Sequence, residues 1–587
     1  MSLLSELSAV FGDAFASLGL DAAFGEVGVS QRPELAQFQC NGALPAAKPA
    51  GKNPRELAQE VIDAVGDRPE FAILEIAGPG FINITLTDDH LAAAVNQMVA
   101  DPRLSLPPPR ARNIVVDYGG PNVAKELHVG HLRPAIIGES VKRILRVLGN
   151  SVTGDVHLGD WGTPQGQLIV ELESRHPGWV YFDPLFTGPY PEEAPVSMEV
   201  LQEIYPVASQ KARDDLAFGE AARRAVLELQ EGRPGYVALW QHMRDVSVAA
   251  IKAVYDRLGV EFDLWYGEST VNGRLAPMIE RFVEAGYAVE SAGAMVIDVS
   301  EPDDTKEIPP LMLVKSDGAT LYTTWDVATI EDRVETMGAN EIVYVVDVRQ
   351  SLHFEQVFRA ARKTGIAGDD VVLEHAGNGT VNGPDGKPLK TRDGGLPLLR
   401  DLLDDVERRA AERLDENHLA TEYPEAERVE IARLVGVAAL IYGDLRNHRA
   451  SNYIFDIDRF TAFDGKTGPY LLYGAVRMKS ILREAALRDI AVGGVMPPLV
   501  DQDRNLMLQV LRFPEMVERA AEFWAPNHLA EYAYELVADF SRFYEACHIL
   551  GETDPAVQAG WLGLVDLTLR TLTTTLDLLG IELPERM

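Results

Sequence analysis

The chain has 587 residues, 46% of them hydrophobic, and its 54 basic and 89 acidic residues give a formal net charge of −35. This composition predicts a globular protein of several domains. The chain has no long apolar run, so a membrane span is not expected. Its first residues lack the basic segment of a secretory signal, so we expect a cytoplasmic protein. The acidic excess argues against non-specific nucleic-acid binding, which depends on neutralising phosphates. Two cysteines, Cys40 and Cys547, offer no disulfide framework and no multi-cysteine site, so no structural zinc is expected.

Residues 1–110 predict a small, separate α/β domain. An amphipathic helix comes first, and Asn53 before Pro54 predicts a second helix that runs to Val65. Strands are expected over residues 71–76 and 80–86. The run Pro107-Pro108-Pro109 is typical of a stiff linker to the next domain.

Strand patterns alternate with helix patterns over residues 111–400, which predicts a parallel α/β sheet. Residues 165–260 are mostly long helices and are interpreted as an insertion into this fold. Beyond residue 400 the hydrophobic periodicity is almost purely helical, which indicates a bundle. We divide this part into a helical connector over 401–465 and a helical domain over 466–587.

The most informative stretch joins a strand at residues 114–116 to a helix after residue 131. A turn at Gly119-Gly120-Pro121 and the tetrapeptide His128-Val129-Gly130-His131 lie between them. A helix N-terminus that follows a glycine-bearing turn can hold phosphate, because its free N–H groups and the positive end of its dipole point at the ligand. Two imidazoles there can donate to phosphoryl oxygens, and Gly130 lets a flat base approach the backbone.

Four residues of the pattern HxGH are weak evidence alone, since a helix start with two incidental histidines is equally common. The wider context is more specific, because Asn122 and Lys125 precede the motif and Gly154–Thr163 (GDVHLGDWGT) follows about one helix later. Together these segments resemble the nucleotide-binding core of class I aminoacyl-tRNA synthetases and, within that class, the arginyl-tRNA synthetase family. The motif comprises Pro121, Asn122, Val123, Ala124, Lys125, Glu126, Leu127, His128, Val129, Gly130 and His131.

The resemblance extends over nearly the whole chain and implies its fold and partners. It implies a Rossmann-type catalytic domain over 111–400 with a helical insertion, an N-terminal domain over 1–110 that contacts the tRNA elbow, and an anticodon-binding helical domain over 466–587. The implied reaction activates L-arginine with ATP to arginyl-adenylate and transfers arginine to the 3′ end of tRNA-Arg. Mg²⁺ on the ATP phosphates is implied, and we expect a monomer.

The same resemblance implies which residues stabilise charge on the phosphates. His128, Gly130, His131 and Lys390 are expected to bind ATP, and the catalytic set is expected to be His128, His131, Lys125, Lys390 and Arg392. Lys390 and Arg392 lie in a glycine-flanked loop over 382–395, the counterpart of the KMSKS loop of class I enzymes. This chain has Leu389-Lys390-Thr391-Arg392 without the usual final lysine, and Lys125 is the candidate for the missing charge. A plain solvated basic turn is the alternative interpretation of the loop.

Two further segments are expected to line the amino-acid pocket. Residues 315–326 predict a turn and then a strand that ends in a carboxylate, although a hairpin whose Asp326 caps the next helix is also possible. Residues 343–347 predict a buried parallel strand, so that Gln350 falls where ligands bind in such sheets.

The resemblance implies that these segments hold arginine. Asn122 is expected at the α-amino or carboxylate end of the substrate, Asp117, Tyr322 and Asp326 near its guanidinium, and Gln350 beside it. A guanidinium is a planar fork of five donors, so a selective pocket needs carboxylates and neutral acceptors.

Two other classes of protein remain possible from the sequence. One is an HxGH nucleotidyltransferase that makes a small-molecule adenylate without RNA, against which the N-terminal domain and the large helical C-terminal part argue. The other is a non-catalytic RNA-binding protein, against which the intact HxGH motif and the polar pocket residues argue.

Overall fold

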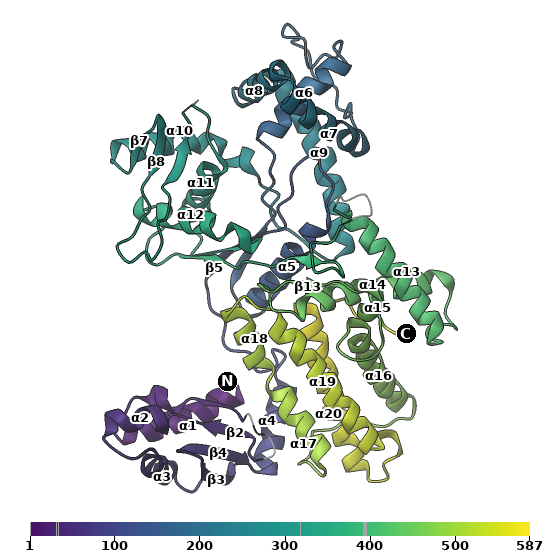
Figure 1. Ribbon diagram of the computed structural model, residues 1–587. Coiled ribbons are helices and arrows are strands. Elements are labelled where there is room, and N and C mark those ends of the chain that lie inside the picture. The colour runs from purple at the N-terminus through teal and green to yellow at the C-terminus, as the bar shows by residue number, and fades with distance from the viewer. Residues whose placement is uncertain (1, 31, 33–34, 317, 391–395) are drawn as a thin grey trace.

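The computed structural model describes the whole chain except residues 1, 31, 33–34, 317 and 391–395. Figure 1 shows three parts: an N-terminal unit, a central α/β region whose two lobes extend upward, and a bundle of helices below that region. Mixed α/β architecture with a parallel sheet and a helical C-terminal part is the predicted fold class, which is confirmed.

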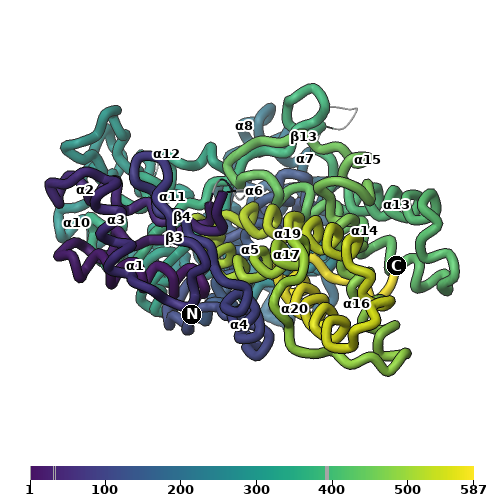
Figure 2. Tube along the Cα trace, turned by 90° about the horizontal axis from the view of Figure 1, so that it is seen from below, coloured from purple at the N-terminus to yellow at the C-terminus, as the bar shows by residue number. Residues whose placement is uncertain are grey.

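The N-terminal unit is built on an antiparallel sheet in the order β1-β2-β4-β3. The predicted helix over 54–65 is confirmed, and the Asn53 side chain caps it by accepting a hydrogen bond from the Arg55 N–H. The last helix, α4, packs on α17 (Asp501–Leu511) of the bundle, and Figure 2 shows the two parts side by side. The elements are α1 (Leu3–Ser17), η1 (Ala22–Gly25), β1 (Val27–Val29), β2 (Phe38–Cys40), α2 (Ala43–Ala50), α3 (Pro54–Val65), β3 (Phe71–Ala77), β4 (Phe81–Leu86) and α4 (Asp88–Ala100).

The central sheet has four parallel strands in the order β11-β10-β5-β6. Its strands are β5 (Asn113–Tyr118), β6 (Ser151–Asp155), β10 (Glu341–Val345) and β11 (Val372–His375). The register pairs Tyr344 with Asp117 and Asp117 with Asp155. These three side chains therefore form one row near the carboxyl ends of neighbouring strands.

Helices cover both faces of this sheet. On one face lies α5 (Leu132–Val147), which begins directly after the HxGH turn and is packed so closely that a Cβ at Gly138 would lie 2.2 Å from the Tyr118 ring. The other face packs in a second hydrophobic core with α11 (Tyr322–Glu335) and α12 (Ser351–Lys363). Successive strand residues point to opposite faces, so Tyr118 lies under α5 and Asp117 faces α11.

Two lobes extend from the sheet. The predicted helical insertion is confirmed as α6 (Thr163–Arg175), α7 (Met198–Asp214), α8 (Leu216–Gln230) and α9 (Pro234–Arg257). The second lobe contains α10 (Glu268–Glu284) and a three-stranded antiparallel sheet, so the region is less uniformly parallel than the sequence pattern predicted. The strands of that sheet are β7 (Ala288–Ser291), β8 (Ala294–Ile297) and β9 (Leu311–Val314).

The predicted strand that ends at Asp326 is wrong, because residues from Tyr322 onward form helix α11. Two threonines at the start of this helix contact the neighbouring strand. Thr323 and Thr324 donate their hydroxyl groups to the backbone oxygens of Met312 and Leu313 in β9, each at 2.6 Å. These contacts fasten the start of the helix to the neighbouring strand.

The C-terminal part is helical, as predicted, and its helices α17 (Asp501–Leu511) and α18 (Phe513–Glu522) meet at Arg512, ahead of Pro514. The bundle contacts the central region through Trp524, whose indole Nε1 donates to Glu341 Oε1 at 3.3 Å. No helix within the described residues is long and apolar enough to cross a membrane. The remaining elements are η2 (Val129–His131), η3 (Val348–Gln350), β12 (Val381–Asn382), α13 (Leu399–Glu416), α14 (Glu425–Leu445), β13 (Tyr453–Ile454), α15 (Ile457–Phe460), α16 (Gly468–Leu487), α17 (Asp501–Leu511), α18 (Phe513–Glu522), α19 (Asn527–Ala546), η4 (Ile549–Gly551) and α20 (Pro555–Leu578).

Candidate active site

A cavity of about 360 Å³ opens beside the HxGH turn, near the carboxyl ends of β5 and β10. Ligands of open α/β sheets bind at this edge. The cavity brings together the glycine turn after β5, the HxGH motif, Gln350 and the segment around Leu389, which are far apart in the sequence. Its walls include Gly119, Gly120, His128, Gly130, His131, Arg133, Asp347, Arg349, Gln350, Asn378, Thr380, Pro388, Leu389 and Leu396.

The HxGH turn holds both histidines in fixed orientations. His128 Nδ1 accepts a hydrogen bond from the Gly130 N–H at 3.0 Å, and His131 Nδ1 accepts one from the His128 N–H at 3.1 Å. The two rings lie 4.0 Å apart. A Cβ at Gly130 would lie 2.8 Å from the His128 ring, so the glycine is needed for this packing.

Both imidazoles are poor bases in this environment. Burial and the nearby charge of Lys125 lower the pKa of His128, and burial together with His128 lowers the pKa of His131 to about 3. Both rings are therefore neutral at physiological pH. Because each Nδ1 accepts a backbone hydrogen bond, each proton resides on Nε2, which makes both rings donors at that nitrogen.

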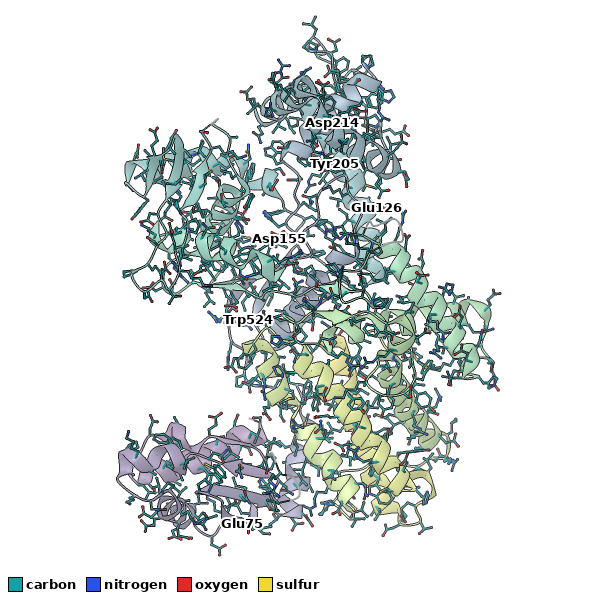
Figure 3. All side chains as sticks on the ribbon, viewed as in Figure 1. Glu75, Glu126, Asp155, Tyr205, Asp214 and Trp524 are labelled. Carbon is teal, nitrogen blue, oxygen red and sulfur yellow. The ribbon has the colours of Figure 1, made fainter. Side chains whose placement is uncertain are left out.

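The residues that precede the motif lie at the edge of the site. Asn122 is exposed and forms a backbone bridge with Gly159, where a Cβ would lie 2.3 Å from the Asn122 Oδ1. Lys125 Nζ lies 4.5 Å from the centre of the Tyr205 ring in the insertion. In Figure 3, Tyr205 lies in the upper helical lobe, above Glu126, the residue next to Lys125.

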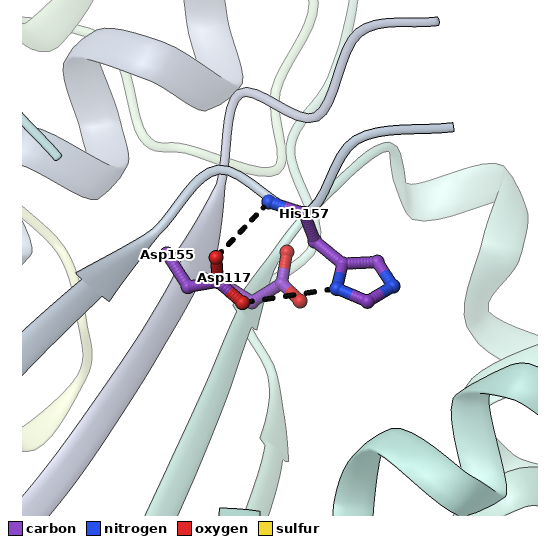
Figure 4. A group of neighbouring side chains, drawn as sticks. All are labelled: Asp117, Asp155 and His157. Atoms are coloured by element: carbon purple, nitrogen blue, oxygen red, sulfur yellow. Dashed lines mark hydrogen bonds and ion pairs between the residues drawn. The ribbon is translucent and has the colours of Figure 1, made fainter. Parts of the chain in front are cut away.

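Asp117, Asp155 and His157 form a second polar cluster at the ends of β5 and β6 (Figure 4). Their ligand atoms lie within 4.8 Å of one another, a spacing that would suit a metal ion. A guanidinium contacts both carboxylates instead: Arg333 Nη2 of α11 donates to Asp117 Oδ2 and to Asp155 Oδ2, each at 2.6 Å. The predicted arginine-binding residue Asp117 is thus already paired with an arginine of the protein.

The proton affinities of this cluster follow from burial and charge. Burial raises the pKa of Asp117, and the charge of Arg333 opposes that rise. Burial would also raise the pKa of Asp155, but the nearby His157 and Arg333 bring it below its usual range. Burial opposes protonation of His157, yet the carboxylates of Asp155 and Asp117 raise its pKa to about 8.

Tyr322 and Asp326 lie one turn apart on α11. Asp326 Oδ2 lies 2.6 Å from His353 Nε2 of α12, and the Tyr322 and His353 rings lie 4.9 Å apart. Glu268, at the start of α10, is close enough for Asp326 and His157 to affect it, and burial raises the pKa of Glu268 to about 7. Several carboxylates therefore surround the space between α11 and the strand ends.

Part of the predicted KMSKS-like loop over 382–395 belongs to the described residues. Leu389 lines the cavity, and the next residue, Lys390, is exposed at its margin. The segment that follows the loop lies beside the HxGH turn, because the Val129 N–H donates to the Pro397 backbone oxygen at 2.9 Å. Arg392, the other predicted cation of this loop, lies outside the described residues.

Sequence reasoning included Asp155 and His157 only as members of the GDVHLGDWGT segment, without a role in the site, and it missed Glu268, Arg333 and His353. Asp155 ends a strand next to β5, so the rule that ligands bind at strand ends was a usable signal for it. Arg333 and His353 gave no such signal, because their roles depend on how α11 and α12 pack over the sheet.

Three family descriptions match successive parts of the chain. Residues 3–86 match "Arginyl tRNA synthetase N terminal domain", residues 94–457 match "tRNA synthetases class I (R), catalytic domain", and residues 471–587 match "DALR anticodon binding domain".

Whole-chain comparisons agree with these matches. The chain is 48% identical to an arginine–tRNA ligase of Alkaliphilus oremlandii and 49% identical to one of Hyphomonas neptunium, in each case over 100% of both proteins. The fold resembles the arginyl-tRNA synthetases of Plasmodium falciparum and Thermus thermophilus, each with a TM-score of 0.82. Those matches cover 100% of this chain and 99% and 100% of theirs, at 24% and 23% identity.

Proposed function

Because the chain belongs to the arginyl-tRNA synthetase family and ligates L-arginine to tRNA with ATP, we propose that ATP binds in the cavity beside the HxGH turn and arginine at the adjoining strand ends. The observation that carries the activity is the identity of 42–49% to arginine–tRNA ligases over the full chain. The assignment of residues to steps rests on the geometry of the site.

The first step joins the arginine carboxylate to the α-phosphorus of ATP and releases pyrophosphate. In the second step a ribose hydroxyl at the tRNA 3′ end takes the arginyl group and AMP leaves. Positioning and charge stabilisation are sufficient for such transfers. The Nε2–H groups of His128 and His131 donate to phosphoryl oxygens, and Gly130 admits the nucleotide to the turn.

Cations complete the phosphate site. Lys125 carries its charge close enough to both histidines to lower their pKa, and Lys390 lies at the margin of the cavity. We assign both, together with Arg392, to the triphosphate. Mg²⁺ enters with ATP as part of the substrate, and the protein is assigned no ligand to it.

The amino-acid pocket takes its selectivity from carboxylates. Asp117 and Asp326 accept hydrogen bonds from the substrate guanidinium, with Tyr322 and Gln350 beside it, and Asn122 holds the α-amino or carboxylate end. A planar fork of donors fits carboxylates that approach from two directions, whereas the ammonium of lysine is a point charge.

Asp326→Asn tests the pocket. We expect the KM for arginine to rise by about tenfold to a hundredfold with an almost unchanged KM for ATP, since a hydrogen bond to a charged group is lost. The readout is arginine-dependent ATP–pyrophosphate exchange with tRNA present. Asp332→Asn is the matched control, because Asp332 lies on the same helix but pairs with Arg274 at 2.9 Å. Equal rises in the KM for arginine and in the KM for ATP would contradict the assignment of Asp326 to the arginine pocket.

The tRNA contacts are assigned to the two terminal parts, 1–110 to the elbow and 466–587 to the anticodon. We further propose that the protein acts as a monomer in the cytoplasm. Light scattering, measured as the protein elutes from a size-exclusion column, gives the oligomeric state. Aminoacylation of total tRNA with each of the twenty amino acids tests the activity, and arginine alone is expected to be attached.

A further inference from the structure

Arg333 is a fully buried charged group at the strand ends, and the steps proposed above do not use it. Its side chain is only 2% exposed, and Nη2 bridges Asp117 Oδ2 and Asp155 Oδ2 at 2.6 Å each. The guanidinium also lies over the Tyr344 ring, 5.3 Å from its centre. It therefore covers the row that Tyr344, Asp117 and Asp155 form across three strands.

The Arg333 bridge reduces the repulsion between the two carboxylates at the strand ends. The register of β5 and β6 forces two buried carboxylates to lie side by side, and like charges in such a site drive one of them to take up a proton. A protonated Asp117 would be a poor acceptor for a guanidinium. A bridging guanidinium opposes this proton uptake and fixes the orientation of both carboxylates.

Within the described part of the chain, hydrogen bonds to the Asp117 side chain are made only at Oδ2. The second oxygen, Oδ1, therefore stays available. Helix α11 connects this oxygen to the rest of the pocket, because Tyr322, Asp326 and Arg333 are spaced i, i+4 and i+11 and so share one helical face. Arg333 follows Asp326 by two turns, about 10 Å along the helix axis.

We propose that Arg333 is a positioning residue for substrate selection: it occupies Oδ2 of Asp117, leaves Oδ1 for the guanidinium of the incoming arginine, and cancels one of the negative charges at the strand ends. This inference rests on the proposed role of Asp117 in arginine binding. Asp326 then supplies the second carboxylate from the start of the same helix. The substrate meets a pocket in which each acceptor oxygen has a fixed direction.

Three variants test this role in ATP–pyrophosphate exchange with tRNA present. Arg333→Met removes the bridge, and we expect the KM for arginine to rise by about tenfold to a hundredfold, with kcat and the KM for ATP changed less than about threefold. Arg333→Lys keeps the charge but not the fork, so an intermediate rise is expected. Adding Asp155→Asn to Arg333→Lys leaves Asp117 as the single partner of the ammonium, and this double variant is expected to return toward the wild-type KM.

The rescue by the double variant separates positioning from a merely structural role. Arg274→Met is the matched control, because Arg274 also pairs with an acid of α11 but lies outside the site; its KM values are expected to equal those of the wild type. Should Arg333→Met fail to fold by circular dichroism, Arg333→Lys and the double variant decide the matter alone. Equal rises in both KM values, or a double variant no better than Arg333→Lys, would overturn the inference.

Asp117→Asn distinguishes this inference from the proposed function beneath it. If Asp117→Asn leaves the KM for arginine unchanged, the assignment of Asp117 to the substrate is wrong and the role of Arg333 fails with it. If Asp117→Asn raises that KM while the Arg333 variants do not, only the inference about Arg333 is overturned.

Discussion

The two histidines of the HxGH turn show how single residues acquire a chemical role from backbone contacts. Each Nδ1 accepts a backbone N–H, and burial keeps both rings neutral, so both Nε2–H groups are donors at physiological pH. A preorganised neutral donor stabilises developing charge without having to reorganise during the reaction.

Replacing His131 by alanine removes one such donor. We expect His131→Ala to slow adenylate formation by about 10²–10³, the size typical of one lost charge-stabilising donor. Pyrophosphate exchange measures the effect, and His90→Ala in the N-terminal unit serves as a control. A near-wild-type exchange rate in His131→Ala would remove the role assigned to this residue.

Glu268 gives a pH-dependent prediction. Burial raises its pKa to about 7 in the folded protein, above its ordinary value of 4.5, so its contribution to stability is greatest below pH 4.5 and is lost as the pH rises through 7. Glu268→Gln stays neutral at every pH. The variant should therefore be more stable than the wild type at pH 8, by at most about 3 kcal/mol, and almost equally stable at pH 4. Thermal unfolding at both pH values measures this, and an equal difference at the two would refute it.

At the scale of elements, the packing of α5 on β5 sets the position of the HxGH turn. Gly138 allows that packing, because a Cβ there would lie 2.2 Å from the Tyr118 ring. The turn begins the same helix, so a shift of α5 displaces both histidines relative to the strand ends.

A pair of glycine variants tests this packing. Gly138→Ala should destabilise the protein by about 1–3 kcal/mol through overpacking and lower the rate of pyrophosphate exchange. Gly273→Ala is the matched control within α10, where nothing lies within 4 Å of an added Cβ. The Gly273→Ala substitution should stabilise the protein by about 0.5–1 kcal/mol, since alanine favours a helix. Similar changes in stability and in the rate of pyrophosphate exchange for both variants would show that the close packing of α5 on Tyr118 does not determine the position of the HxGH turn.

At the scale of the whole molecule, the helical bundle is attached to the helix that starts at the active site. Ser140 Oγ of α5 donates to the Leu578 backbone oxygen of α20 at 2.7 Å, and Arg143 pairs with Asp577 at 2.8 Å. The C-terminal helical part and the proposed phosphate site therefore share α5 as a common element.

The net charge of −35 also acts at this scale. Few phosphate contacts are expected with such an excess of acids, so the KM for tRNA should rise less than about tenfold between 50 and 200 mM salt, whereas six to ten contacts would cost about 10³–10⁵. Steady-state aminoacylation over a salt series measures this. Double-stranded DNA added as a competitor should not inhibit, and a steep salt dependence would contradict the expectation.

The sequence by itself determined the order of the parts, the parallel sheet, the helical bundle and the position of the HxGH turn. These features depend on local signals, such as the capping Asn53, the glycines after β5 and the spacing of apolar residues. The predicted strand that ends at Asp326 was wrong, because the contacts between the threonines of α11 and β9 cannot be seen in the sequence.

Only the tertiary structure decided which charges meet. Arg333 is 216 residues from Asp117 and 178 residues from Asp155 in the sequence, and His353 is 27 residues from Asp326. No local sequence pattern predicts these pairs. Their partners are chosen by strand register and by the packing of α11 and α12 over the sheet. The physical reason is that hydrophobic periodicity fixes which face of an element is buried, whereas the partners of a buried charge depend on which faces come together.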